Sequence, residues 1–368
     1  MRKETIMKLN FLILLIITLS VYYGCSRDVV TNSGSNTYEG VFVLYEGDFN
    51  VPGSGDYSFI NSNNDSVSNS VFQNSNSGAN LGLTPDGLII YNNLELFVSS
   101  QGSYGGSGRM FRISSRTNKL IDTVTFGTNP YSLVYTTGRI YATNIAGNTV
   151  TKLDLDLNVL STLNTGPNPS EITTAGNYVY VSKASYTTQN TFTVLDIRND
   201  NAILQIPFPS TPISSATING KVYVSAYRNK TIYIMNYEDT LNPNIINDSI
   251  VLPPQVFTRP ACTFIVTADN NTLYAAGADT FAFGYYSGRT VYKIDIPSKT
   301  VSQFVDLQGL TGDDIYGMDY DKEKKFLYIA STNGGSTNGL VLKFDPNGVL
   351  VKTYQVGGKY PRRFAFAY

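Results

Sequence analysis

A short strand-like segment recurs seven times along the chain, and this repetition restricts the fold more than any other feature of the sequence. Each copy has an apolar residue, then an aromatic residue, then small or apolar residues. The copies are Val41-Phe42-Val43, Leu96-Phe97-Val98-Ser99, Ile140-Tyr141-Ala142-Thr143, Val179-Tyr180-Val181-Ser182, Val222-Tyr223-Val224-Ser225, Leu273-Tyr274-Ala275-Ala276 and Leu327-Tyr328-Ile329-Ala330. Their starts lie 39 to 55 residues apart, a spacing typical of one four-stranded blade with its loops. We therefore predict an all-β fold, a seven-bladed β-propeller of four-stranded antiparallel blades.

Two further landmarks accompany the copies. An apolar residue and a turn-forming residue follow each one, at Ile60-Asn61, Ile113-Ser114, Leu153-Asp154, Leu195-Asp196, Met235-Asn236, Ile294-Asp295 and Phe344-Asp345. We expect these turn formers to close the hairpin between the third and fourth strands; a ring of metal ligands is the alternative, but turn chemistry already explains one such residue per repeat. A Gly or Pro cluster then opens the next inner strand, as at Gly127-Thr128-Asn129-Pro130, Gly166-Pro167-Asn168-Pro169, Thr211-Pro212, Arg259-Pro260 and Tyr360-Pro361.

The positions of the first and last strands within the repeat predict how the ring closes. The first copy, at Val41, is a second strand, and the chain ends with an alternating segment from Arg363 to Tyr368 that stands where each inner strand stands. We expect this C-terminal segment to supply the innermost strand of the N-terminal blade. Such closure hides an exposed sheet edge.

The first 25 residues indicate export. A basic start precedes an apolar run from Leu9 to Leu19, which is too short to span a bilayer and is typical of a secretory signal. The following Tyr22-Tyr23-Gly24-Cys25 resembles the lipobox of bacterial lipoproteins, with Tyr22 and Tyr23 in the places usually held by Leu and a small residue. We expect a lipid on Cys25, and either Met1 or Met7 fits as the start of the signal.

The same features divide the chain into three parts. We predict a signal peptide over residues 1–24, a lipid-anchored flexible tether over 25–36 and the propeller over 37–368. The expected location is the bacterial cell envelope, with the protein anchored to the outer membrane and facing the periplasm or the surface. We expect a monomer that meets the membrane through its N-terminal lipid only.

Composition excludes several kinds of chemistry. The chain has no histidine, so a Ser-His-Asp relay, an imidazole base and a His-held metal are impossible. It also has no tryptophan, which weakens a sugar-stacking site, and its formal net charge of −1 gives no reason to expect a nucleic-acid partner. The only cysteines are Cys25 and Cys262, so lipidation of Cys25 leaves Cys262 without a disulfide partner. We predict no cofactor and no bound metal.

One stretch of the repeat carries a specific resemblance. Tyr141-Ala142-Thr143-Asn144, followed by Asn148-Thr149-Val150 and Leu153-Asp154, resembles the YVTN-type repeat of bacterial surface-layer-like propellers. The likeness covers roughly residues 37 to 368 and is clearest in the third to fifth blades. It implies a binding protein, since such propellers are often non-enzymatic. Some similar lipoprotein propellers capture cobalamin for an outer-membrane transporter. Cobalamin capture is therefore one specific form of binding that the resemblance implies.

The loops that join second to third strands, and those that enter the inner strands, should share one end of the channel. These loops carry aromatic and charged residues among glycines, and such residues offer rigid contact area and planar hydrogen bonding. The predicted ligand-binding residues there are Tyr104, Tyr131, Asn144, Tyr186, Tyr227, Arg228, Arg259, Phe283, Tyr285, Asp314, Tyr316, Tyr360 and Arg362. We predict that this face recognises a small molecule, a peptide or a protein; packing of the channel mouth is the alternative for any single residue.

An enzyme is the competing hypothesis. Propeller lactonases and sugar-acid hydrolases hold a calcium ion in the channel with Glu, Asn and Asp side chains. The residues that could converge in this way are Glu171, Asn144, Asp279, Asp313 and Asp314. Several such families also rely on histidine, which this chain lacks.

Overall fold

The computed structural model describes residues 38–184, 189–199, 203–226, 229–237, 246–257, 261–282, 285–312 and 314–368. Side chains of residues 203, 261–264, 278–282 and 285–287 are not part of this description. Contacts divide the chain between Thr37 and Tyr38, and every described residue belongs to the second unit. No helix in the described ranges has the length and apolar character needed to cross a membrane.

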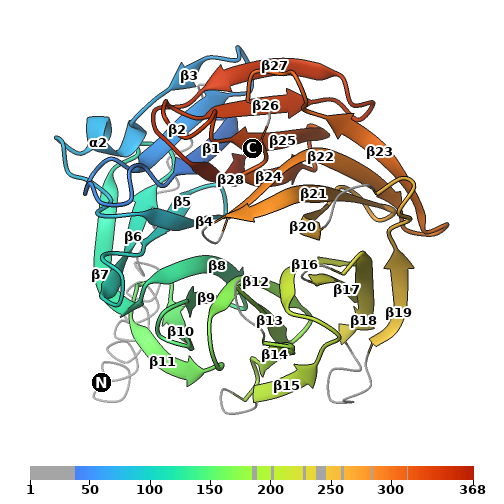
Figure 1. Ribbon diagram of the computed structural model, residues 1–368. Helices are drawn as coiled ribbons and strands as arrows, with labels where there is room; N and C mark the ends of the chain where they lie inside the picture. Colours follow the sequence, from blue (N-terminus) through green and yellow to red (C-terminus); the bar gives the residue numbers. More distant parts are fainter. Residues whose placement is uncertain are drawn as a thin grey trace, which may run out of the picture. The chain divides into compact units, whose positions relative to one another are not determined.

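Seven four-stranded antiparallel sheets form a ring, as the repeat predicts (Figure 1). Blade 1 contains β28 (Pro361–Ala367), β1 (Gly40–Tyr45), β2 (Asp56–Asn61) and β3 (Val67–Ser68); blade 2 contains β4 (Pro85–Tyr91), β5 (Glu95–Ser100), β6 (Ser107–Ser114) and β7 (Leu120–Thr128). Blade 3 contains β8 (Pro130–Thr136), β9 (Arg139–Asn144), β10 (Thr149–Asp154) and β11 (Val159–Asn164); blade 4 contains β12 (Pro169–Ala175), β13 (Tyr178–Lys183), β14 (Thr191–Asp196) and β15 (Ile203–Pro207). Blade 5 contains β16 (Pro212–Ile218), β17 (Lys221–Ala226), β18 (Thr231–Asn236) and β19 (Ile246–Val251); blade 6 contains β20 (Ala261–Thr267), β21 (Thr272–Ala282), β22 (Tyr285–Asp295) and β23 (Thr300–Asp306). Blade 7 contains β24 (Gly317–Asp321), β25 (Phe326–Ser331), β26 (Leu340–Phe344) and β27 (Leu350–Gln355), and one short helix, α2 (Val71–Ser75), follows β3.

The two ends of the domain meet in blade 1, which confirms the predicted closure. Strand β28 pairs antiparallel with β1, and Phe364 lies opposite Val43. The C-terminal strand is therefore the innermost strand of a blade whose other strands come from the N-terminal side. Each blade in the ring consequently has its full set of four strands.

The predicted turn formers close the outer hairpins. Asp154 Oδ1 accepts the backbone N–H groups of Asp156 and Asn158 at 3.0 and 2.8 Å. Asp345 Oδ1 does the same for Asn347 and Val349, both at 2.9 Å. These carboxylates therefore act as Asx-turn acceptors between the third and fourth strands.

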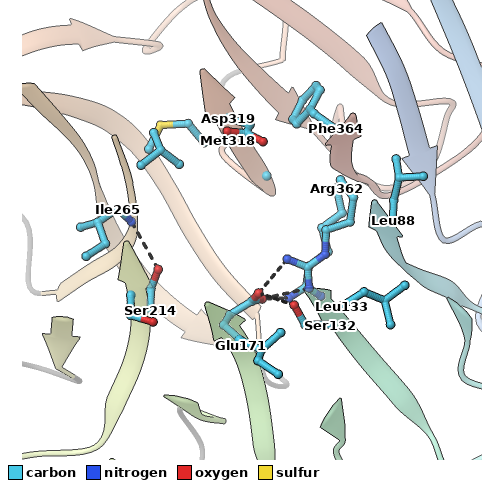
Figure 2. Close-up of a pocket in the computed structure, with 15 residues that line it drawn as sticks. Leu88, Ser132, Leu133, Glu171, Ser214, Ile265, Met318, Asp319, Arg362 and Phe364 are labelled. Atoms are coloured by element: carbon cyan, nitrogen blue, oxygen red, sulfur yellow. Dashed lines mark hydrogen bonds and ion pairs between the residues drawn. The ribbon is translucent and has the colours of Figure 1, made fainter. Parts of the chain in front are cut away.

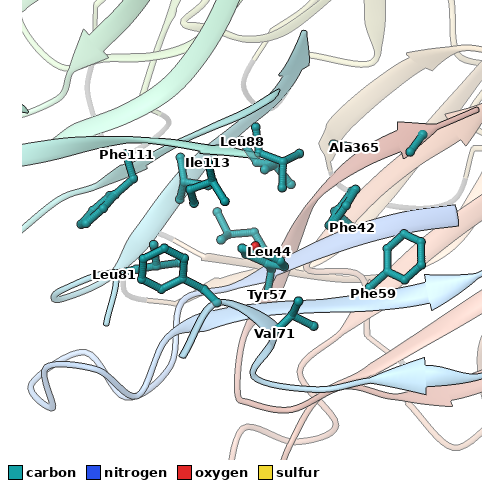
Figure 3. Packing of buried hydrophobic residues seen from close by; sticks show 14 residues of the cluster. Phe42, Leu44, Tyr57, Phe59, Val71, Leu81, Leu88, Phe111, Ile113 and Ala365 are labelled. Atoms are coloured by element: carbon teal, nitrogen blue, oxygen red, sulfur yellow. The ribbon is translucent and has the colours of Figure 1, made fainter. Parts of the chain in front are cut away.

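The core lies between neighbouring blades. Figure 3 shows the buried cluster between blades 1 and 2, which includes Phe42 and Tyr57 of blade 1. Within this cluster Phe72, which follows β3, meets Phe111 of β6 edge to face at 6.0 Å between ring centroids. Leu88 of β4 and Phe111 of β6 belong to the same buried cluster. Because each blade buries apolar side chains on its neighbours, the blades hold the seven inner strands β28, β4, β8, β12, β16, β20 and β24 around a central channel.

The inner strands share an irregular start. Pairing with the second strand shifts register just after the opening proline in blades 1 to 5, where it falls at Arg362, Asp86, Tyr131-Ser132, Ser170-Glu171 and Ile213. A bulge of this kind adds a residue to one strand and turns its side chain out of the regular alternation. In blades 1, 3 and 4 the bulge residues Arg362, Ser132 and Glu171 line the channel.

Candidate functional site

The central channel contains a cavity of about 210 Å³ that all seven inner strands line (Figure 2). One side is charged and carries Glu171, Arg362 and Arg363. The opposite side presents Ser214 and Ser215 of β16, followed by Ile265 and Val266 of β20. The volume corresponds to roughly seven water molecules. A ligand in this cavity would therefore be small.

Two adjacent arginines bind Glu171 across the channel. Arg363 Nη1 donates to Glu171 Oε2 at 2.7 Å, and Arg363 Nη2 donates to Oε1 at 3.0 Å. Arg362 Nη2 donates to the same Oε1 at 3.1 Å, and the Ser132 hydroxyl donates to Oε2 at 3.2 Å. The bulge at Arg362 allows neighbouring residues of one strand to reach the same carboxylate.

Two more carboxylates complete this cluster. Glu46, which follows β1, lies 3.2 Å from Arg362 Nη1 and accepts a hydrogen bond of 3.0 Å from the Tyr316 hydroxyl. Asp86 of β4 lies 3.6 Å from Arg362 and 3.5 Å from Arg363. Gln101 donates to Asp86 at 2.8 Å. Since the Glu46 side chain is 2% exposed and the Asp86 side chain is fully buried, both charges depend on these partners.

Aromatic rings enclose the Arg362 guanidinium. Its central carbon lies 4.5 Å from the ring centroid of Tyr131 and 5.8 Å from that of Tyr316. The Arg362 guanidinium also donates a hydrogen bond to the Tyr131 hydroxyl. Tyr360 packs 5.6 Å from Tyr316 and 4.8 Å from Phe49, so the aromatic group continues away from the arginine.

Burial changes the proton affinity of the channel carboxyls. Loss of water, and then the charge of Asp86, raises the pKa of Glu46 from 4.5 to about 7. Loss of water also raises the pKa of Asp86 above its ordinary value, although Arg362 and Arg363 oppose the change. In Asp319 of β24, burial raises the pKa to about 6. The channel therefore holds carboxyl groups that take up protons close to neutral pH.

Four of the predicted binding residues come together at this cluster. Tyr131 and Tyr316 contact Arg362, and Tyr360 packs on Tyr316. These four residues come from the start of β8, the segment before β24 and the start of β28. They are the part of the predicted recognition surface that the structure brings together.

Other predicted residues lie elsewhere. Asn144 is buried in blade 3, where its amide donates to Thr149 and Thr151 at 2.9 and 2.8 Å. Asp314 binds the Ser331 hydroxyl and accepts the Thr332 N–H at 3.1 Å. Tyr104 is 93% exposed in the loop between β5 and β6. Outside the description lie Tyr186, Tyr227, Arg228, Arg259, Phe283, the side chain of Tyr285, and Cys25.

The residues proposed for a calcium ion do not assemble within the described part of the chain. Glu171 is taken up by two arginines, and Asn144 and Asp314 bind within their own surroundings. Asp313 and the side chain of Asp279 lie outside the description. Among the described side chains, no group of three or more Asp, Glu or Cys residues is placed to hold a metal ion.

Sequence reasoning missed Glu46, Asp86, Asp319 and Arg363. Position relative to proline is a signal that could have found one of these four, Asp86. Asp86 directly follows Pro85, just as Arg362 follows Pro361, and each occupies the bulge that opens an inner strand. Glu46 and Asp319 carry no comparable mark.

These features define a seven-bladed β-propeller with a narrow, charged central channel. The chain belongs to the family described as domain of unknown function (DUF5074), which matches residues 39–367. No curated protein gives a significant match.

Solved structures share the fold at low sequence identity. A putative 6-phosphogluconolactonase from Bacteroides fragilis is similar with a TM-score of 0.65 and 15% identity, covering 91% of this chain and 99% of that one. The periplasmic gluconolactonase of Pseudomonas aeruginosa gives 0.65 and 15%, with 89% and 99% covered. A quinonprotein alcohol dehydrogenase-like protein from Bacteroides thetaiotaomicron gives 0.66 and 13%, with 91% and 80% covered. At these identities the likeness concerns the fold alone.

Proposed function

We propose that the domain is a non-catalytic binding module that admits a small molecule to its central channel, beside Arg362, whose guanidinium contacts Tyr131 and Tyr316. The observation that carries this proposal is the pairing of the channel carboxylates with arginine. Glu171 receives two guanidinium groups, and Glu46 and Asp86 share Arg362. Carboxylates held in this way are poor ligands for a metal and poor general bases, but they make a fixed polar wall.

The sequence supports a location for this module. The signal over residues 1–24 and the lipobox-like segment ending at Cys25 favour an exported lipoprotein of the bacterial envelope. The YVTN-like repeat adds a likeness to binding propellers, and cobalamin capture remains a specific case of it. A cavity of about 210 Å³ is small for a corrinoid, which favours a smaller ligand within the channel.

Blocking the channel tests the proposal. Ser215 lines the cavity, so Ser215→Phe should fill it, whereas Ser302→Phe places the same ring on the exposed strand β23. Small molecules that raise the melting temperature of the native protein in a thermal-shift screen should also act on Ser302→Phe and not on Ser215→Phe. Equal response of both variants would show that binding occurs outside the channel.

A hydrolase is the second candidate, and one observation favours it. Asp86, Glu171 and Asp319 belong to three inner strands around one channel, and the proteins of similar fold include a putative 6-phosphogluconolactonase and a periplasmic gluconolactonase. If the domain is a calcium-dependent lactonase, calcium should raise its melting temperature and D-gluconolactone should be hydrolysed, as followed by acid release. If calcium has no effect and no hydrolysis is detected, the result contradicts the lactonase hypothesis and favours the binding module.

A further inference from the structure

The channel carries more negative than positive groups. Four carboxyl groups, on Glu46, Asp86, Glu171 and Asp319, face two guanidinium groups, on Arg362 and Arg363, among the described residues. Three of the carboxyls lie within 4 Å of an arginine nitrogen. The arginines thus pair with the three carboxyls on one side of the channel, whereas Asp319 has no arginine nitrogen within this distance among the described residues.

Asp319 lacks an ion pair in the described part of the chain. Its Oδ1 accepts the backbone N–H of Tyr320 at 2.7 Å, and its side chain lines the cavity across from Glu171 (Figure 2). Arg363 and Lys322 act on Asp319 only at longer range. A carboxylate in a narrow protein cavity gains from a positively charged partner, because little water is present to screen the interaction.

A second polar group on the cavity wall also lacks a partner among the described residues. The Ser215 hydroxyl on β16 is buried and makes no hydrogen bond with them. Its neighbour Ser214 is occupied, because the Ile265 N–H donates to the Ser214 hydroxyl at 3.4 Å. Buried polar atoms are nearly always satisfied, so Ser215 is an exception, but its enclosed oxygen is not exposed to a ligand in the cavity.

Apolar side chains separate these two groups. Strand β20 lies between β16 and β24 in the ring, and its Ile265 and Val266 line the cavity. Met318 and Phe364 extend the same apolar wall. This part of the channel therefore combines one carboxylate with a surface suited to a short hydrocarbon chain.

We propose that the channel binds a small organic ammonium ion, with the ammonium group at Asp319 and its hydrocarbon part against Ile265 and Met318. This inference rests on the proposed function, because it names the ligand class of the same channel. An ammonium group supplies the positive charge for Asp319, and its alkyl stem matches the apolar wall.

Three probes with one hydrocarbon chain test the charge. Isothermal titration calorimetry of the full protein with n-butylammonium, n-butanol and n-butyrate compares a cation, a neutral donor and an anion. We expect n-butylammonium to bind at least tenfold more tightly than n-butanol, and n-butyrate to bind most weakly. Equal binding of the three probes, or tighter binding of n-butyrate, would overturn the inference, as would no binding of n-butylammonium at millimolar concentration.

A matched pair of variants tests the position. Asp122 on β7 is exposed and accepts the N–H of its following residue at 2.7 Å, as Asp319 does. Asp319→Asn should abolish the tenfold preference for the cation, and Asp122→Asn should keep it. Retention of the preference in Asp319→Asn would overturn the inference.

The pH gives a second readout at the same residue. Protonation of Asp319 near its pKa of about 6 should reduce the preference for n-butylammonium between pH 7.5 and 5. Arg363, Lys322 and Asp321 are the charged groups that act on Asp319, and Asp319→Asn retains them. The part of the pH effect that Asp319→Asn removes therefore belongs to Asp319; an unchanged pH effect in that variant contradicts the inference.

Failure of the inference differs from failure of the proposed function. If the thermal-shift screen finds neutral or anionic ligands that Ser215→Phe excludes, the channel binds ligands but the ammonium assignment is wrong. If ligands bind Ser215→Phe as well as the native protein, the channel is not the binding site and both conclusions fall.

Discussion

Arg362 shows how much one residue contributes to the channel. It binds Glu46, Asp86 and Glu171, and its guanidinium stacks on Tyr131. Its side chain is only 10% exposed, so its charge and those of its partners are sheltered from water. Removal of one partner from such a group leaves unpaired buried charges, which destabilise a protein more than the pair itself stabilises it.

Arg362→Met should therefore lower the free energy of unfolding by about 3 to 5 kcal/mol, because it removes a positive partner from the buried carboxyls of Glu46 and Asp86. Lys324→Met is the control, since Lys324 pairs with Glu39 at the surface and should matter little. Urea unfolding followed by circular dichroism measures both. A loss in Arg362→Met no larger than in the control would contradict the role given to Arg362.

The raised pKa of Glu46 predicts a pH dependence of stability. Its folded pKa of about 7 lies above the ordinary 4.5, so the folded state holds the proton more tightly than the unfolded state. This contribution to stability is complete below about pH 4.5 and is lost as the pH rises through 7. We expect the free energy of unfolding to fall between pH 5 and 8, and to fall less in Glu46→Gln. Parallel pH profiles for the two proteins would exclude Glu46 as the source.

At the scale of elements, hairpin turns and bulges form the two opposite ends of the inner strands. Two-residue turns join the inner to the second strand in blades 3, 4 and 5, as between β8 and β9, where Thr137 and Gly138 have φ of 46° and 74°. Positive φ at both positions is the geometry that suits the twist of paired strands. In blades 1 to 5 the opposite end of the inner strand begins with a proline and a bulge, and these ends carry Asp86 and Arg362.

A substitution at Gly138 tests the turn. A Cβ built on Gly138 meets nothing within 4 Å, so its φ of +74° is the sole source of strain. Gly138→Ala should lower the free energy of unfolding by about 1 kcal/mol, and Gly138→Asn by less, because Asn tolerates left-handed backbone better. Chemical unfolding of both variants measures the difference. If Ala and Asn cost the same, backbone strain is not the cause.

The sequence predicted the elements better than it predicted the site. Blade number and ring closure follow from repeated local patterns, and each hairpin is decided by a few neighbouring residues. The channel is different, because Glu171 and Arg362 are 191 positions apart in the chain and meet only after the ring closes. No local pattern marks Glu46 or Asp319, whose roles arise from burial beside other blades.

At the scale of the whole molecule, ring closure and the channel depend on the same strand. β28 completes blade 1 by pairing with β1, and its two arginines reach Asp86 in blade 2 and Glu171 in blade 4. Phe364 also packs on Tyr328 of blade 7, with 6.1 Å between ring centroids. The C-terminal strand therefore joins the first and last blades and forms part of the channel wall.

Deletion of residues 364–368 should open the ring. It removes most of β28, exposes the edge of β1 and leaves Val41 and Val43 without Phe364 and Phe366. An unpaired apolar strand edge favours aggregation, so we expect little soluble monomer by size-exclusion chromatography and no cooperative melting by circular dichroism. Deletion of Tyr368 alone is the control: it removes the hydrogen bond of 2.7 Å from its hydroxyl to Asp321 but leaves β28 intact, and the protein should stay monomeric and fold. Normal melting of the five-residue deletion would mean that blade 1 holds its place without the C-terminal strand, and the coupling of closure to the channel would then be wrong.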